Sequence, residues 1–181
     1  LDAVNVAIQG TTDPQALVGD VIAIVLERFG ADRAFLARRD HDPVAWVIVD
    51  ERTRPEWPGG GPGHVICDLD PVFAESLASG RALQYGLDDA RGLSIAVLQQ
   101  YGVVAAYGAA LSPAGHGPSV LGLPYCHDYT GWSANDERLL QEIGRRLTDA
   151  LTVARAHHAL KHSEDRLREA QRLTRLGYWE R

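Results

Sequence analysis

Cysteine and histidine side chains could do covalent or metal chemistry at two places in this sequence. Cys126 is followed directly by His127, and His64 lies three residues before Cys67. A thiol beside an imidazole could bind a pigment covalently or respond to oxidants. A metal site needs three or four converging ligands, and adjacent residues of a strand point to opposite faces. We therefore predict no metal site, and we interpret Cys126 either as a pigment-binding or redox-sensing thiol or as a partly buried apolar side chain.

The adjacent histidines His157 and His158 are a further candidate for chemistry, as phosphate acceptors. Their neighbours Ala156, Ala159 and Leu160 lack the acidic residue and proline that accompany the acceptor in histidine-kinase helices. The sequence also contains no Gly-x-Ser-x-Gly turn and no glycine-rich phosphate loop. We expect no catalytic apparatus in this chain, and its residues require no particular cofactor.

The composition excludes several other classes of protein. Of 181 residues, 45% are hydrophobic and 23% are charged, which is typical of a folded globular domain. The net charge of −6 argues against nucleic-acid binding, because contacts with phosphates favour a basic surface. No stretch approaches the roughly 18–20 apolar residues of a membrane-spanning helix. We expect a cytoplasmic chain without a membrane segment, cut from a longer protein that could itself carry a membrane anchor.

Turn residues and apolar spacing divide the chain into helices and strands. Asp13 and Pro14 predict the start of a helix, and Gly30 predicts its end. Further helices are predicted after Asp70 and over 93–101. A Gly- and Pro-rich loop and five strands complete the domain: the loop over 54–63, and the strands over 33–37, 45–49, 82–85, 103–111 and 120–127.

The last helix is predicted to be longer than the domain itself. Ser133 caps it, and residues 134–176 contain no proline, so that the helix would span roughly 65 Å and must leave the globule. Its apolar residues follow coiled-coil spacing in two stripes with a change of register between them: Leu140, Ile143, Leu147, Ala150 and Ala154, then Leu160, Leu167, Ala170, Leu173 and Leu176. The first stripe could equally pack on the domain. For the second, pairing with another copy of the chain is favoured, and we therefore predict a homodimer.

Aromatic and small side chains indicate where a ligand would bind. They alternate along Val103, Ala105, Tyr107 and Ala109, which leaves room above one face of a strand. We predict a pocket for a small molecule of unknown identity, with these candidate binding residues: Trp46, Trp57, Phe73, Tyr107, Cys126 and His127. The alternative is that the aromatic residues simply fill the core.

Four segments, in this order, make the chain similar to the GAF domain family: 30–34, 101–104, 120–123 and 132–140. The resemblance implies an α/β (α+β) fold: a central antiparallel sheet of about six strands, flanked by helices, with a small-molecule pocket on one face. The stretch 163–171, followed by 176–180, resembles the entry helix and first strand of a PAS domain. We accordingly assign 1–155 to a GAF sensory domain, 156–176 to a linker or coiled-coil helix, and 177–181 to the start of a PAS domain.

Bacterial proteins that join these two domains in this way are most often sensor histidine kinases of two-component systems, and some are diguanylate cyclases. The resemblance implies a sensory domain that binds a small molecule, dimerises, and relays a signal to PAS and output domains of the same chain. The alternatives are a purely structural dimerisation module, or a bilin, haem or redox sensor that uses Cys126. Cyclic nucleotides are not expected, because their GAF sites carry an Asn-Lys pattern and the single lysine here, Lys161, lies outside the domain.

Overall fold

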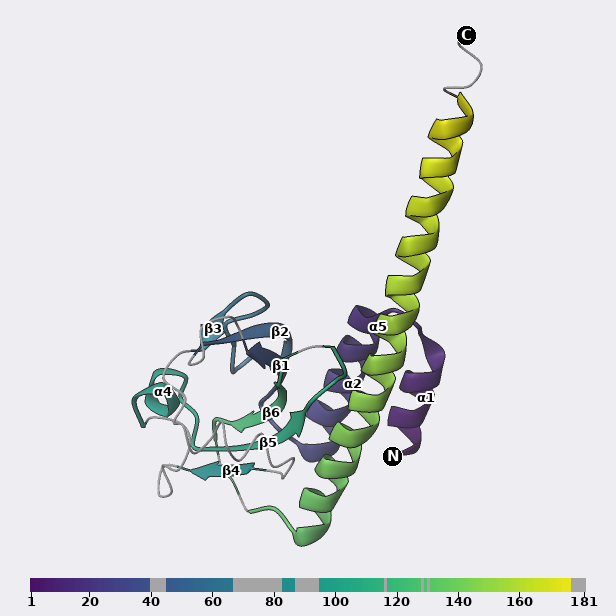
Figure 1. The fold of residues 1–181 in the computed structure, drawn as a ribbon. Helices are drawn as coiled ribbons and strands as arrows, with labels where there is room; N and C mark the ends of the chain where they lie inside the picture. The colour runs from purple at the N-terminus through teal and green to yellow at the C-terminus, as the bar shows by residue number, and fades with distance from the viewer. Residues whose placement is uncertain are drawn as a thin grey trace.

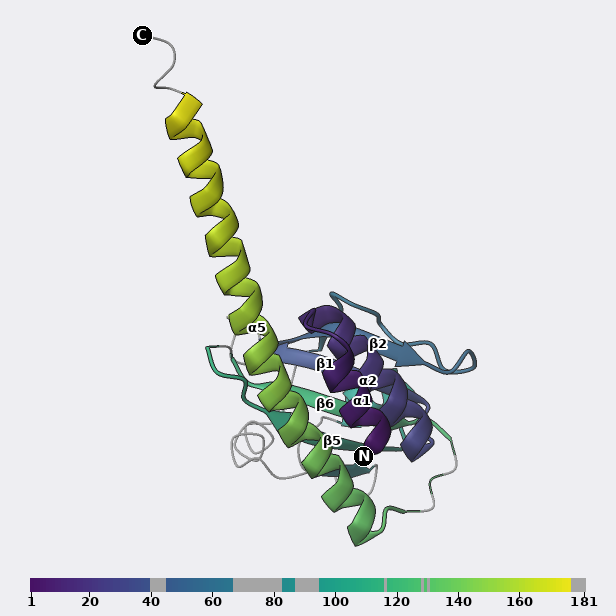
Figure 2. The same ribbon diagram turned by 90° about the vertical axis from the view of Figure 1, so that its right-hand side faces the viewer.

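The central feature of the fold is an antiparallel sheet with helices packed on one of its faces (Figure 1, Figure 2). The computed structural model describes residues 1–39, 45–66, 83–86, 95–115, 117–127, 129 and 131–176. Within these residues the sheet has six strands in the order β3-β2-β1-β6-β5-β4. The α+β fold class predicted from the sequence is therefore confirmed.

Helix α2, Pro14–Phe29, begins and ends where the sequence predicts. The side chain of Asp13 accepts a hydrogen bond from the backbone N–H of Gln15 at 3.1 Å, and Gly30 ends the helix in the left-handed conformation at φ 60°. A preceding helix that the sequence analysis does not assign, α1 (Asp2–Gly10), buries Val4 in the same core as α2. Figure 2 shows α1, α2 and α5 on the same side of the sheet.

The strands form two hairpins that meet in the middle of the sheet. Strand β1 (Arg33–Arg39) pairs with β2 (Trp46–Thr53) on one side and with β6 (Ser119–Tyr125) on the other. Strand β6 pairs in turn with β5 (Ala105–Leu111), while β3 (Val65–Ile66) and β4 (Leu83–Gly86) form the two edges. Five of these strands (β1, β2, β4, β5 and β6) confirm the predicted ones, with ends shifted by a few residues, whereas β3 was not predicted. Within the predicted helix over 93–101 the structure describes α4, Ile95–Gln100, and the helix predicted after Asp70 lies outside the described residues.

Helix α5, Ala134–Leu176, is a continuous helix of 43 residues, as the sequence predicts. Its first turn is closed by a reciprocal pair: Ser133 Oγ accepts from the backbone N–H of Asp136 at 3.2 Å, and the Asp136 carboxylate accepts from the backbone N–H of Ser133 at 3.2 Å. The N-terminal half lies along the domain and the C-terminal half projects from it (Figure 1). Among the described residues, no helix is both long and apolar enough to cross a membrane.

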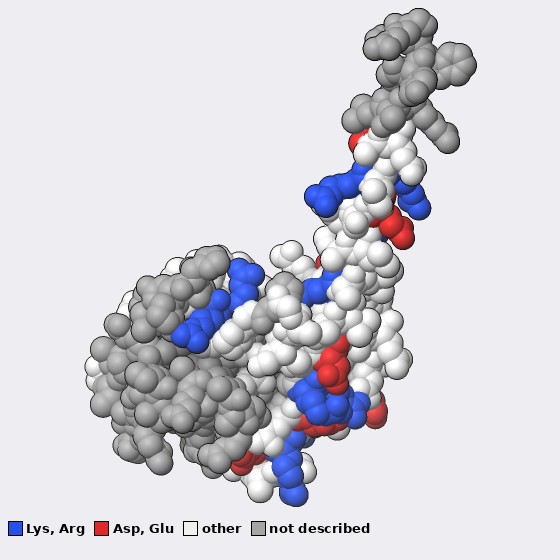
Figure 3. Space-filling model, viewed as in Figure 1, with Lys and Arg blue, Asp and Glu red and all other residues white. Residues whose placement is uncertain are grey.

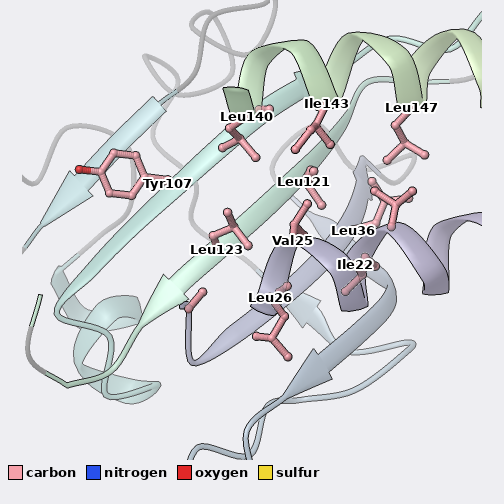
Figure 4. Close-up of a cluster of buried hydrophobic side chains, with 14 of the residues drawn as sticks. Ile22, Val25, Leu26, Leu36, Tyr107, Leu121, Leu123, Leu140, Ile143 and Leu147 are labelled. Atoms are coloured by element: carbon pink, nitrogen blue, oxygen red, sulfur yellow. The ribbon is translucent and has the colours of Figure 1, made fainter. Parts of the chain in front are cut away.

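The first apolar stripe of α5 belongs to the core of its own domain. Leu140, Ile143 and Leu147 point at Leu121 and Leu123 of β6 (Figure 4), and they are fully buried. Leu151 and Ala154 continue this buried face, with Ala150 partly buried beside it. Of the two alternatives left open for Leu140, Ile143, Leu147, Ala150 and Ala154, the structure shows packing on the domain, because the sheet covers this stripe. Leu160 and Leu167 of the second predicted stripe are 60% and 61% exposed, and Ala170 is exposed as well.

Candidate functional site

A cavity of about 90 Å³ lies on the face of the sheet that α1, α2 and α5 do not cover. Side chains alternate along each strand, so that Leu36 of β1 packs toward the helices while Phe35 and Ala37 face the cavity. The space is large enough for several water-sized groups, and it is smaller than the roughly 300–1,000 Å³ of pockets for drug-sized ligands.

The walls of the cavity are almost entirely apolar. They come from five strands, from α4 and from the turn after it: Phe35, Ala37, Trp46, Ile48, Ile66, Leu98, Val103, Ala106, Val120 and Gly122. Leu98 lies on α4, which thus closes the cavity from the side opposite the sheet. An apolar molecule would displace water from these walls without breaking protein hydrogen bonds.

A few polar side chains border this apolar space. Arg33 is only 7% exposed, and its guanidinium donates to two backbone carbonyls: Nε to Trp57 at 2.9 Å and Nη2 to Tyr101 at 3.0 Å. Within the described part of the chain, no carboxylate lies within ion-pair distance of Arg33. The Tyr101 hydroxyl is hydrogen-bonded to Nε2 of His64, and their rings meet edge to face with centroids 5.4 Å apart. Through its two hydrogen bonds to Trp57 and Tyr101, Arg33 connects the loop over 54–63 to the residue that follows α4.

The Gly-rich loop closes tightly against this polar border. The carboxylate of Glu51, which also lines the cavity, accepts a hydrogen bond from the backbone N–H of Gly61 at 2.6 Å. A Cβ atom at Gly59 would overlap with Glu51, and one at Gly60 would overlap with His64. These two glycines are needed because the backbone passes directly over both side chains.

Trp46, one of the predicted ligand-binding aromatic residues, is fully buried and forms part of the cavity wall. Trp57 and His127 stack on each other beside the cavity, with centroids 6.2 Å apart and ring planes 4° apart, and neither lines it. His127 Nδ1 is 2.8 Å from Oδ2 of Asp32, whose side chain is completely buried. Phe73 lies outside the described residues.

Cys126 is buried next to the cavity and does not line it. Its backbone N–H donates to Oδ2 of Asp32 at 2.6 Å, and its Sγ is 3.9 Å from the carbonyl oxygen of Tyr101. Burial raises the pKa of the Cys126 thiol, and the nearby positive charge of Arg33 offsets this only in part. Because the thiolate is the reactive form, this environment disfavours attack by Cys126 on a pigment or an oxidant.

The side chain of Tyr107 points away from the cavity, whereas the sequence predicts that it binds a ligand there. Its ring lies in the core on the helix side, stacked on Trp132 and hydrogen-bonded through its hydroxyl to Tyr129. Because Ala106 faces the cavity and neighbours on a strand alternate, it is the main chain of Tyr107 that borders the cavity. The predicted row of Val103, Ala105, Tyr107 and Ala109 is thus split: Val103 lines the cavity, and the other three face the helices.

The polar residues of the site were not singled out from the sequence. Arg33 and Tyr101 both lie within the segments that resemble the GAF family, and His64 was considered only as a partner of Cys67. The signal available was the charged pair Asp32-Arg33 directly before the apolar run 34–37, since charges at the start of such a strand are buried with it.

Metal ligands do not converge in the part of the chain that the structure describes. Those residues contain no group of three or more His, Cys, Asp and Glu side chains placed to hold a metal ion. His64 takes part in the cavity border, whereas Cys67 lies outside the described residues.

The described residues thus form an α+β domain with an apolar cavity on one face of its sheet and a long exit helix on the other. Residues 13–151 match the GAF domain family, and the chain therefore belongs to that family. No curated protein matches the chain in sequence.

Several solved structures share this fold at low sequence identity. The phycoerythrobilin-bound GAF domain of a cyanobacterial phytochrome superposes with a TM-score of 0.72 at 15% identity, over 86% of this chain and 94% of that one. The GAF domain of PixJ from Thermosynechococcus elongatus, in its blue-light absorbing form, gives a TM-score of 0.68 at 20% identity, over 86% and 93%. A far-red absorbing protein with bound biliverdin, JSC1_58120g3, gives 0.71 at 16% identity, over 85% and 98%.

Proposed function

We propose that this GAF domain is a sensory module, without catalytic activity of its own, that binds a compact and largely apolar molecule in the cavity and relays its presence to α5. The proposal rests on the position of β5, which lies between the cavity and α5. Ala106 of β5 borders the cavity, while Tyr107 and Ala109 of the same strand face the helix side. A ligand that moves β5 therefore acts on residues packed against the beginning of α5.

The contact between β5 and α5 is close enough to transmit a small displacement. A Cβ atom at Gly144 of α5 would lie 3.0 Å from the Cβ of Ala109, so that the helix passes directly over the strand at this point. A ligand shifts the position of α5 only if it binds one arrangement of β5 and α5 more tightly than the other. A difference of about 1–3 kcal/mol between the two would be typical of a signalling domain.

The projecting half of α5 supports an output through a second copy of the chain. Val153, Leu160 and Leu167 recur at intervals of seven residues, and they are 70%, 60% and 61% exposed. Such a stripe is the pattern that pairs two helices in a coiled coil, and burying it would favour a homodimer. The proposal extends to a sensor histidine kinase as the parent protein, with a PAS domain after α5, and to a diguanylate cyclase as the alternative output.

A second candidate function is bilin or haem sensing, and the bilin is favoured by three structural neighbours that contain a bilin or absorb light. The buried Cys126, whose thiol pKa is raised, favours non-covalent binding over a thioether link in this chain. Incubation of the purified chain with biliverdin or hemin, followed by gel filtration, gives the test. A pigment absorbance that co-elutes with the protein supports this function, and a colourless protein peak rules it out.

The experiment that tests the main proposal is a thermal-shift screen of small apolar metabolites, with a variant whose cavity is filled. A ligand at 100 times its dissociation constant adds about 2.7 kcal/mol to the free energy of unfolding. Ala106→Phe places a ring in the cavity and is expected to abolish the shift. Ala114→Phe, at an exposed position of the β5–β6 turn, is the matched control and is expected to keep it. A folded chain that no compound stabilises would support a purely structural dimerisation module instead.

The dimer is tested separately by size-exclusion chromatography with light scattering. The double variant Leu160→Asp, Leu167→Asp is expected to elute as a monomer, because the charges cannot be buried in a helix pair. Arg166→Gln, at an exposed position between the two, is expected to remain dimeric. A monomeric wild-type chain at high concentration would contradict pairing through α5.

A further inference from the structure

The guanidinium of Arg155 is placed without a partner at the point where α5 leaves the domain. Its Nη1 atom is buried and has no hydrogen-bond acceptor. Within the described part of the chain, Arg155 also makes no ion pair. A buried donor that has lost water and gained no acceptor destabilises the folded protein, so its presence calls for an acceptor from elsewhere.

A second positive charge, that of Arg38, lies close to this guanidinium. Arg38 is on β1, two residues after Leu36, whose side chain packs in the core on the helix side. Because alternate residues of a strand share a face, the Arg38 side chain leaves the sheet on the side of α5. Burial, and then the charge of Arg38, lower the pKa of Arg155. The two guanidinium groups thus repel each other, and among the described residues neither makes an ion pair with a carboxylate.

The surrounding stretch of α5 is basic although the whole chain carries a net charge of −6. Residues 150–163 contain Arg155, Lys161 and three histidines, and no acidic residue. The acidic residue just before this stretch, Asp149, is already paired with Arg145 at 3.1 Å. Figure 3 shows basic side chains at the base of the projecting helix. The local charge therefore favours an anion from solution.

The β5–β6 turn approaches the same point of α5. The backbone N–H of Ala114 donates to Oγ1 of Thr152 at 3.2 Å, one helical turn before Arg155. The position is thus bordered by α5, by the end of β1 and by the turn. It is separate from the cavity, none of whose lining residues takes part.

We propose that Arg155 and Arg38 form a binding site for a tetrahedral oxyanion, an inorganic phosphate or the phosphate group of a small metabolite. The planar guanidinium can donate two parallel hydrogen bonds to such an anion, and a negative charge between the two arginines replaces repulsion with attraction. An anion bound there joins β1 to the last buried turn of α5. It would fix the direction in which the helix leaves the domain, independently of what the cavity holds.

The test compares phosphate with chloride on the 181-residue chain. Thermal unfolding is followed in increasing sodium phosphate and in sodium chloride at the same ionic strength, for wild type, Arg155→Gln and Arg38→Gln. Arg166→Gln, on the exposed part of α5, is the matched control. Titration of the ³¹P resonance of phosphate with protein gives the dissociation constant directly. Adenosine monophosphate in parallel distinguishes a phosphate ester from the free ion.

We expect phosphate to raise the unfolding temperature of the wild type and of Arg166→Gln above the value in chloride. Arg155→Gln is expected to weaken phosphate binding at least tenfold while folding normally, because it removes the unpartnered donor. Arg38→Gln is expected to weaken binding less.

Phosphate also stabilises many proteins without a site, by exclusion from their surface. An equal rise in Arg155→Gln would therefore overturn the proposal. A wild type that unfolds at the same temperature in phosphate and in chloride would also overturn it. A third contrary result would be a dimer that dissociates in Arg155→Gln while phosphate has no effect, because the partner of Arg155 would then be a carboxylate of the second copy.

Discussion

The ring of Tyr107 on β5 lies face to face with the ring of Trp132, next to the residue that caps α5: their centroids are 3.8 Å apart and their planes differ by 2°. Trp132 also stacks on Phe29 at the end of α2, with centroids 4.7 Å apart, and its Nε1–H donates to the hydroxyl of Tyr125 at 2.8 Å. This aromatic cluster joins the strand that borders the cavity to the start of the exit helix.

Replacing Trp132 tests how much this cluster stabilises the domain. Trp132→Ala removes two ring stacks and one hydrogen bond, and we expect it to lower the free energy of unfolding by about 3 kcal/mol, measured with urea. Trp132→Phe keeps an aromatic ring, so it should lose only about 1 kcal/mol with the hydrogen bond. An alanine variant as stable as the phenylalanine variant would contradict a stabilising role for the stacks.

The two buried tyrosines of the cluster predict a loss of stability at alkaline pH. Burial raises the pKa of Tyr125 to about 12, and burial together with the hydrogen bond to Tyr129 raises the pKa of Tyr107 well above its ordinary value. Because the folded protein holds these protons more tightly than the unfolded chain, their contribution is complete below about pH 10 and is lost as the pH rises further. The free energy of unfolding should fall by roughly 1.4 kcal/mol per pH unit for each tyrosine over that range.

Urea unfolding at several pH values from 8 to 11 measures this slope, and the absorbance of tyrosinate measures the ionisation. Tyr125→Phe should make the slope shallower, since one of the two groups is removed. The expectation fails if every tyrosine of the folded protein ionises near pH 10.

Gly122 of β6 should resist substitution more than Gly108, its partner across β5 and β6. A Cβ atom at Gly122 would overlap with the ring of Phe35, which borders the cavity, whereas at Gly108 the nearest atom would be Cγ2 of Val120 at 3.2 Å. We expect Gly122→Ala to lower the free energy of unfolding by about 1–3 kcal/mol and to push Phe35 into the cavity, weakening any ligand found in the screen. Gly108→Ala should change both quantities less, and equal effects would argue against the close contact.

Asp32 should matter far more than the histidine with which it pairs. Its buried carboxylate accepts from the backbone N–H of Cys126 at 2.6 Å and lies 2.8 Å from Nδ1 of His127. Asp32→Ala leaves that buried N–H without an acceptor, and we expect a loss of about 3 kcal/mol in urea unfolding. His127→Ala should lose less than about 1 kcal/mol, because the imidazole is half exposed. A larger loss for the histidine variant would reverse this assignment.

The ends of α2, the extent of α5 and the positions of five strands along the chain could be predicted from the sequence because local signals specify them. Asp13, Pro14 and Gly30 mark the two ends of α2, and Ser133 with Asp136 marks the start of α5. The spacing of apolar residues in α5 predicts a helix that leaves the domain. It did not decide which stripe packs on the sheet, because an intramolecular contact and a coiled coil use the same steps of three and four residues.

The candidate site depended on the tertiary structure because the sheet is buried on both of its faces. Strand β6 is buried at every position and β5 at nearly every one, so the alternation of polar and apolar residues that would assign a face is absent. For this reason the sequence could not show that Tyr107 faces the helices, although it did predict that Trp46 lies at the cavity. The polar border and the arginine pair each combine segments far apart in the chain: Arg33 with Tyr101, and Arg38 with Arg155. The sequence by itself determined the family and most of the elements, α1 and β3 excepted, and only the packing of those elements decided which side chains share a cavity.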